Sequence, residues 1–132
     1  MLIECKITSK KNTEFIDITR TITKKIEKTN IKSGTCCIFI PHTTAAVTVN
    51  ENADPAVKED MLMELNKLIP FEDGYKHLEG NSAAHIKASI MGFNETLILD
   101  NGKLVLGTWQ GIYFAEFDGP RERKIYVKLM EG

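Results

Sequence analysis

The chain lacks long apolar runs, an excess of charge of one sign, and a cysteine framework. None of its 132 residues fall in a stretch approaching the roughly 20 apolar residues of a membrane-spanning helix. Its 17 basic and 18 acidic residues give a net charge of −1, which leaves no electrostatic footprint for a nucleic-acid backbone. We therefore expect neither a membrane nor a nucleic-acid partner.

The few cysteines also restrict the class of protein. There are three, two of them adjacent as Cys36-Cys37, and no CxxC pair that would indicate a structural zinc site. An odd number argues for reduced thiols rather than disulfides, and Met1 to Lys6 lacks the charged-then-apolar order of a signal peptide. These features predict a cytoplasmic location.

A glycine-rich phosphate loop and a regular strand–helix alternation are absent as well, which disfavours a nucleotide-binding doubly wound sheet. The chain does have enough apolar residues to form the core of a single domain over residues 1–132, since 42% of its residues are hydrophobic. The expected class is α+β: a mostly antiparallel, sandwich-like β-sheet with about three helices packed on it.

Local patterns give the expected elements. Isoleucines at four-residue spacing predict a helix over 19–29 that ends at Asn30, and Asp54-Pro55 starts a second helix that Pro70 stops. Ser82 is expected to cap a third helix over 83–91, before Gly92. The turn Asp100-Asn101-Gly102 is the most specific hairpin signal. The predicted strands cover 2–9, 14–17, 36–40, 45–49, 96–99, 104–106, 111–117 and 124–130.

The segment from Pro41 to Pro55 holds the densest group of reactive side chains. His42, Thr43 and Thr44 follow a buried strand, and Asn50 and Glu51 come after the next apolar run. Polar groups between buried elements cost free energy unless each finds a partner. Their number predicts an enzyme-like pocket.

Two kinds of metal site are compatible with the residues. His42, His77 and His85 all fall in polar segments, and three imidazoles with one open position would suit zinc, although three unrelated histidines are an equal alternative. Glu51, Asp54 and Asp60 could bind Mg²⁺ or act as general bases. Asp54 is also a natural helix cap, and Asp60 could equally lie on a solvated helix face.

The C-terminal part supplies two further candidates. Arg121 and Arg123 point the same way if the chain is extended, and paired guanidinium groups match phosphate or carboxylate oxygens. An exposed hairpin tip with balanced charges is the favoured alternative. Trp109, between Gly107 and Gly111, could stack on a ring substrate, pack in the core or lie at a subunit interface.

Three segments together resemble a known family. PHTTAAVTVNENADPAVKEDM, HLEGNSAAHIKASIMG and LGTWQGIYFAEFDGPRERKIYV are similar to the YjbQ-type family, also called the secondary thiamine-phosphate synthase family. The resemblance covers Ile38 to Val127. It implies a small α+β fold, a homotrimer, and a weak thiamine-phosphate synthase activity. Many members carry Asp or Asn shortly before the histidine that matches His85, where this chain has Ser82-Ala83-Ala84, so Asn81 is the nearest candidate there.

The resemblance also implies the site residues. Its polar signature falls on the residues already discussed and on Gln110, Glu116 and Asp118. The predicted catalytic residues are His42, Glu51, Asp60 and Glu116; those predicted to bind substrate or an anion are Thr43, Thr44, Asn50, Trp109, Gln110, Arg121 and Arg123; the predicted metal ligands are His42, His77 and His85.

Three functions follow as expectations. The first is a transferase, assisted by a divalent metal (zinc or magnesium), that joins a pyrimidine diphosphate to a thiazole phosphate with loss of pyrophosphate. The alternatives are a metal-dependent hydrolase of a phosphorylated metabolite and a non-catalytic module that binds a small ligand or metal. The expected partners are a phosphorylated small-molecule substrate and two further copies of the chain, because the aromatic strand around Tyr113 leaves a sheet face to protect.

Overall fold

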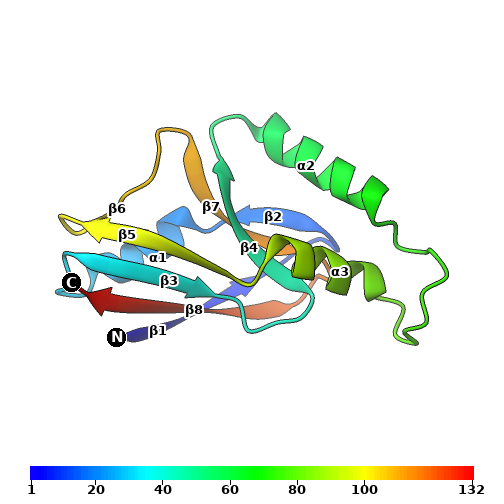
Figure 1. The fold of residues 1–132 in the computed structure, drawn as a ribbon, viewed down its shortest axis with the longest axis horizontal. Coiled ribbons are helices and arrows are strands. Elements are labelled where there is room, and N and C mark those ends of the chain that lie inside the picture. Colours follow the sequence, from blue (N-terminus) through cyan, green and yellow to red (C-terminus); the bar gives the residue numbers. More distant parts are fainter.

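The computed structural model describes residues 1–132 as two antiparallel sheets with three helices (Figure 1). One sheet has five strands in the order β1-β8-β3-β5-β6, and the other has three in the order β2-β7-β4. The α+β prediction is confirmed. The helices are α1 (Thr19–Glu27), α2 (Pro55–Leu68) and α3 (Ser82–Met91); the strands are β1 (Leu2–Thr8), β2 (Glu14–Asp17), β3 (Gly34–Phe39), β4 (Ala45–Glu51), β5 (Asn94–Asp100), β6 (Lys103–Leu104), β7 (Gln110–Glu116) and β8 (Glu122–Glu131).

The main core lies between the inner face of the five-stranded sheet, the three-stranded sheet and α1. Alternate residues of β3 and β8, such as Ile38 and Val127, point inward, as the period of two along a strand requires. Helix α1 contributes Ile22 and Ile26, and β7 contributes Phe114. The spacing of apolar residues in the sequence therefore predicts which face is buried, both in the strands and in the helix.

A second core covers the other face of the three-stranded sheet. Tyr113 and Ala115 of β7 point away from the main core and pack beneath α3, which contributes Ala84 and Ala88. Helix α2 lies on the same side, with Met61 and other apolar residues only partly buried. β7 is thus buried on both faces, which explains why its residues form a continuous apolar run.

Element boundaries differ from the predictions at two helix ends. Helix α1 ends at Glu27 with Lys28 as its C-cap, before the predicted Asn30. Asn81 is the N-cap of α3 and Ser82 is its first helical residue, so the predicted cap was wrong by one position. The side chain of Asn81 makes no capping hydrogen bond, because it is used elsewhere.

Two local predictions are confirmed. Asp54 caps α2 by accepting a hydrogen bond from the Ala56 N–H at 2.9 Å. Asn101 and Gly102 both have positive φ, +52° and +75°, which is the conformation of the tight turn that joins antiparallel strands such as β5 and β6.

The loop between α2 and α3 lies at the end of the molecule opposite both chain termini (Figure 1). It runs over residues 69–81, and the first residues of α3 follow directly. Among the three helices, none has the length and apolar character required to cross a membrane.

Candidate functional site

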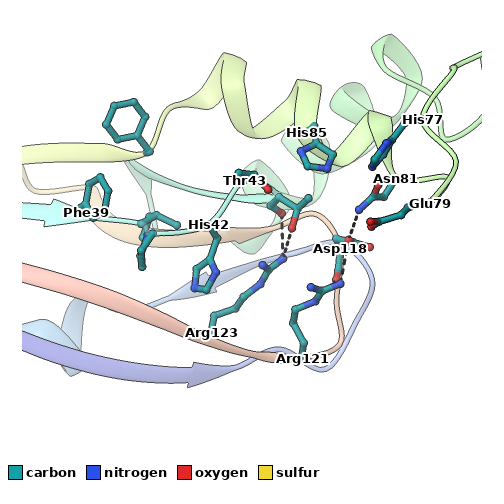
Figure 2. A pocket seen from close by; sticks show the side chains of 14 residues that line it. Phe39, His42, Thr43, His77, Glu79, Asn81, His85, Asp118, Arg121 and Arg123 are labelled. Carbon is teal, nitrogen blue, oxygen red and sulfur yellow. Dashed lines mark hydrogen bonds and ion pairs between the residues drawn. The ribbon is translucent and has the colours of Figure 1, made fainter.

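A cavity of about 830 Å³ lies where the α2–α3 loop meets the ends of β3, β7 and β8 (Figure 2). It brings together three of the segments that the sequence marked as reactive: the Pro41–Thr44 segment, the His77–His85 segment and the Asp118–Arg123 segment. The cavity is lined by Phe39, Ile40, Pro41, His42, Thr43, Thr44, His77, Glu79, Asn81, His85, Phe93, Asp118, Arg121 and Arg123.

The floor of the cavity is a buried ion pair between Arg123 and Glu116. The Arg123 Nε donates to Glu116 Oε1 at 2.9 Å, its Nη2 donates to Oε2, and the same Nη2 donates to Thr44 Oγ1 at 2.8 Å. Glu116 also accepts from Ser9 Oγ at 2.7 Å and from the Asp118 N–H at 3.0 Å. Both partners of the ion pair are at least 97% buried, with exposures of 3% and 0%.

This arrangement corrects the catalytic role predicted for Glu116. Burial would raise the pKa of Glu116, but the hydrogen bonds from Arg123, Ser9 and Asp118 outweigh it and hold the pKa below its usual value. Every oxygen of the carboxylate is already in use, so Glu116 anchors Arg123 and is not placed as a catalytic group. Arg123 in turn is not the exposed hairpin residue that composition favoured.

Arg121 differs from Arg123 because its guanidinium remains half exposed at the cavity. Its Nε donates to the Asp118 carbonyl at 2.9 Å and its Nη2 to Asp118 Oδ2 at 3.1 Å, while Nη1 has no protein partner. Asp118 Oδ2 also accepts from Asn81 Nδ2 at 2.9 Å. Asp118 therefore orients both the cation and the amide, as Figure 2 shows.

The protonation of His42 is fixed by a backbone group. Its Nε2 accepts a hydrogen bond from the Lys124 N–H at 2.9 Å, so that nitrogen cannot carry a proton and the neutral ring must carry it on Nδ1. Burial, and then the positive charge of Arg123, lower the pKa of His42, which favours this neutral form. His42 therefore offers an N–H donor, and in this state neither ring nitrogen has a free lone pair for the catalytic or metal-binding role predicted for it.

The other two histidines form a pair. His77 of the α2–α3 loop and His85 of α3 have ring centroids 5.5 Å apart, with the planes nearly perpendicular at 84°. No group of three or more His, Cys, Asp or Glu side chains is arranged to hold a metal ion. The third predicted ligand, His42, has one nitrogen occupied by the Lys124 N–H and the other protonated. The three histidines therefore do not form a three-imidazole metal site in this structure. Binding of zinc or magnesium stays a prediction, and the structure does not identify its ligands.

Several predicted site residues lie elsewhere. Strand β4 begins beside the cavity at Ala45 and ends at Glu51, so Asn50 and Glu51 are about 20 Å from it at the usual rise of a strand. Gln110 pairs with Glu51 at that distant end, next to Trp109, which is 62% exposed. Asp60 is exposed on α2 and does not line the cavity. The structure therefore separates these five residues from His42.

The lining residues that were not predicted include Glu79, Phe39 and Phe93. Glu79 belongs to the polar loop, and nothing in its sequence context distinguishes it from Glu72 in the same loop. Phe39 and Phe93 meet edge to face with ring centroids 5.7 Å apart at the other end of the cavity. Phe39 comes from the exposed face of β3. The only feature of the sequence that could have indicated its exposure is its alternation with buried Ile38.

Comparison with known proteins now adds to this geometry. The family described as UPF0047 protein YjbQ-like matches residues 3–132. The chain belongs to the YjbQ/UPF0047 family. It is 52% identical to a UPF0047 protein of Methanocaldococcus jannaschii, covering 98% of this chain and 94% of the relative. It is 51% identical to UPF0047 protein YugU of Bacillus subtilis, covering 98% and 99% respectively. The family resemblance seen in the sequence is confirmed.

Two crystal structures share the fold. An uncharacterized conserved protein of the YjbQ/UPF0047 family from Clostridium acetobutylicum has a TM-score of 0.94 at 52% identity, and covers 97% of this chain and 99% of its own. A YbjQ-like protein of unknown function from Sulfolobus solfataricus has a TM-score of 0.95 at 34% identity, covering 100% and 97%.

These relatives overturn the predicted activity. The curated relatives are named only as UPF0047 proteins, and the solved ones are described as uncharacterized or of unknown function. None carries a thiamine-phosphate synthase assignment, so the predicted transferase function was wrong. The geometry agrees with this correction, because two of its proposed catalytic groups, Glu51 and Asp60, lie outside the cavity.

Proposed function

We propose that the cavity recognises a small molecule bearing a phosphate monoester, and that Arg121 and His42 hold the phosphate. The observation that carries the proposal is the state of these two side chains. Arg121 keeps Nη1 without a protein partner, and His42 keeps a donor nitrogen because its other nitrogen accepts from Lys124. Both residues line the same cavity.

The donors suit an oxyanion for a physical reason. A guanidinium held in place by Asp118 loses little side-chain freedom when an anion binds, and its planar nitrogens match phosphate oxygens. The Thr43 hydroxyl is a further possible donor in the cavity lining, and it has no hydrogen-bond partner in the protein. Arg123 contributes positive potential from beneath; its Nε and Nη2 donate to Glu116 and Thr44, and its Nη1 has no protein partner.

A titration followed by ¹H–¹⁵N spectra tests this recognition with ethyl phosphate as the probe, at pH 7.5 and constant ionic strength. The wild-type protein should bind ethyl phosphate more tightly than propionate, because a phosphate monoester carries close to two charges at that pH and three acceptor oxygens. Arg121→Ala should weaken binding by at least about fivefold, as expected for the loss of a charge-assisted hydrogen bond. Arg20→Ala is the matched control, since Arg20 is exposed on α1 and does not line the cavity. Equal affinity in the two variants would refute the proposal.

We also propose that the protein assembles as a homotrimer, as the family resemblance implies. What supports assembly is the outer face of the five-stranded sheet, which no helix covers (Figure 1). Over β3 and β5 this face has a single charged residue, Asp100 at the end of β5, and includes Phe39 and Ile98, which are 40% and 61% exposed. A partly apolar sheet face with little charge is typical of an interface between subunits.

A further inference from the structure

The wall of the cavity formed by the α2–α3 loop carries hydrogen-bond acceptors, whereas Arg121 and His42 provide hydrogen-bond donors. Glu79, Asn81 and Asp118 all line it, and Figure 2 shows the three grouped together, apart from His42. Asp118 accepts from Arg121 and Asn81 through Oδ2, and its negative charge is paired with Arg121. Glu79 makes no hydrogen bond or ion pair within the protein, so its carboxylate is free for a ligand.

Asn81 supplies a second acceptor on this wall. Its Nδ2 donates to Asp118 Oδ2 at 2.9 Å, which fixes the orientation of the amide, because the reversed amide would place oxygen against oxygen. Its Oδ1 is buried and has no hydrogen-bond partner, the only such side-chain atom in the protein. An acceptor shielded from water and left unpaired costs free energy, and a donor from a bound ligand would remove that cost.

We infer that the ligand carries an ammonium group, or a comparable cationic N–H donor, in addition to its phosphate. The inference rests on the proposed recognition of phosphate and assigns the second half of the cavity. The phosphate lies against Arg121 and His42, and the amine donates to Glu79 and to Asn81 Oδ1. A zwitterionic phosphorylated amine matches both walls, whereas a second anionic group would meet Glu79 without compensation.

The nearest alternative ligand is a phosphate monoester whose remainder is uncharged. It would leave Asn81 Oδ1 unpaired and Glu79 in solvent, and the phosphate wall alone would determine its affinity. The two ligand classes therefore differ in a measurable way: only the zwitterion gains affinity from the Glu79 side chain.

A pair of probes separates the classes. Ethyl phosphate and O-phosphoethanolamine differ by one ammonium group, and both are titrated against ¹⁵N-labelled protein at the same pH and ionic strength. The wild-type protein should bind O-phosphoethanolamine roughly five- to tenfold more tightly, a gain expected for a charged donor that meets one exposed and one buried acceptor. Glu79→Gln should reduce this preference to about twofold or less, because the amide keeps the size of the side chain but loses its charge.

The control variant is Glu72→Gln, which removes the same charge from the same exposed loop without altering the lining of the cavity. It should keep the full preference for O-phosphoethanolamine. Equal affinity of the wild type for the two probes, or a preference that survives Glu79→Gln, would overturn the inference while leaving phosphate recognition intact. An equal loss in both glutamine variants would also overturn it, since that result indicates general attraction to an acidic loop. Failure of ethyl phosphate to bind at all would instead refute the recognition of phosphate on which the inference depends.

Discussion

Replacing Arg123 with methionine should destabilise the protein severely, because it leaves the Glu116 carboxylate buried without its countercharge. The methionine keeps most of the apolar stem, so lost packing is a small part of the effect. Breaking a buried ion pair by removing one partner costs about 3–5 kcal/mol. For a chain of 132 residues each kcal/mol corresponds to roughly 3–5 °C, so we expect a fall in Tm of about 10–20 °C at pH 7.

The double variant Arg123→Met/Glu116→Leu decides the cause of this loss. If the cost comes from the uncompensated charge, removing the carboxylate as well should restore most of the stability, since apolar replacements of a buried pair are often neutral. Guanidinium chloride unfolding followed by circular dichroism measures all three proteins. A double variant as unstable as Arg123→Met, or a single variant within about 1 kcal/mol of the wild type, would refute the reasoning.

The dependence on pH gives an independent check of the same pair. In the wild type the pKa of Glu116 is held below its unfolded value, so its contribution to stability is present above the unfolded pKa and is lost as pH falls through the folded pKa. In Arg123→Met the carboxylate is buried without Arg123, which raises its pKa, and acidification from pH 7 to pH 5 should stabilise that variant relative to the wild type. A parallel loss in both proteins would contradict this prediction.

Three shorter predictions follow from other features. The imidazole of His42 should have a pKa below the unperturbed value of about 6.5 when its titration is followed by NMR, and a midpoint at or above that value would contradict the prediction. Its contribution to stability should be present above that pH and decline below it, and His42→Gln should remove this dependence. Lys87 is 1% exposed, donates only to Asn66 Oδ1 at 2.5 Å, and has its pKa lowered by burial. Lys87→Met should therefore leave the stability unchanged or raise it by about 1 kcal/mol. A clear loss of stability in thermal unfolding would show that the contacts of the amine outweigh the cost of burying its charge. Light scattering should give about three times the 14.9 kDa chain mass for the wild type and a smaller mass for Ile98→Lys, whereas a wild-type mass near that of one chain would refute the trimer.

The fold followed from the sequence wherever a local pattern and the tertiary packing agreed. Ile22 and Ile26 lie one turn apart and are buried on one face of α1, as their spacing predicted. Asn101-Gly102 needs positive φ at both positions, which few other residue pairs provide. The end of α1 and the cap of α3 were misplaced, because capping depends on where a side chain finds its partner. Asn81 uses its amide on Asp118, which is 37 residues away in the chain.

The site was predictable only in part, for a geometric reason. His42 and Glu51 are close in sequence, but a seven-residue strand lies between them and carries Glu51 to the other end of the sheet. Arg121 and Arg123 were expected to act alike because residues two apart point the same way in an extended chain. The difference in their burial arises from Glu116, which the β7–β8 hairpin brings beneath Arg123 alone. Glu79 and Phe93 become site residues only through the folding of the loop and of α3, and the sequence carries no signal for that.

The cavity is built from two parts that are coupled very differently to folding. Arg123, Glu116, Thr44 and Ser9 join the two sheets through buried hydrogen bonds, so this part of the cavity forms together with the core. The opposite part of the cavity, with His77 and Glu79, belongs to a loop of largely exposed residues. During divergence, substitutions in that loop can change which molecule is accepted at little expense to stability, whereas almost any change beneath it threatens the fold. One scaffold can therefore exchange ligands by altering about a dozen loop residues while the buried base of the cavity stays the same.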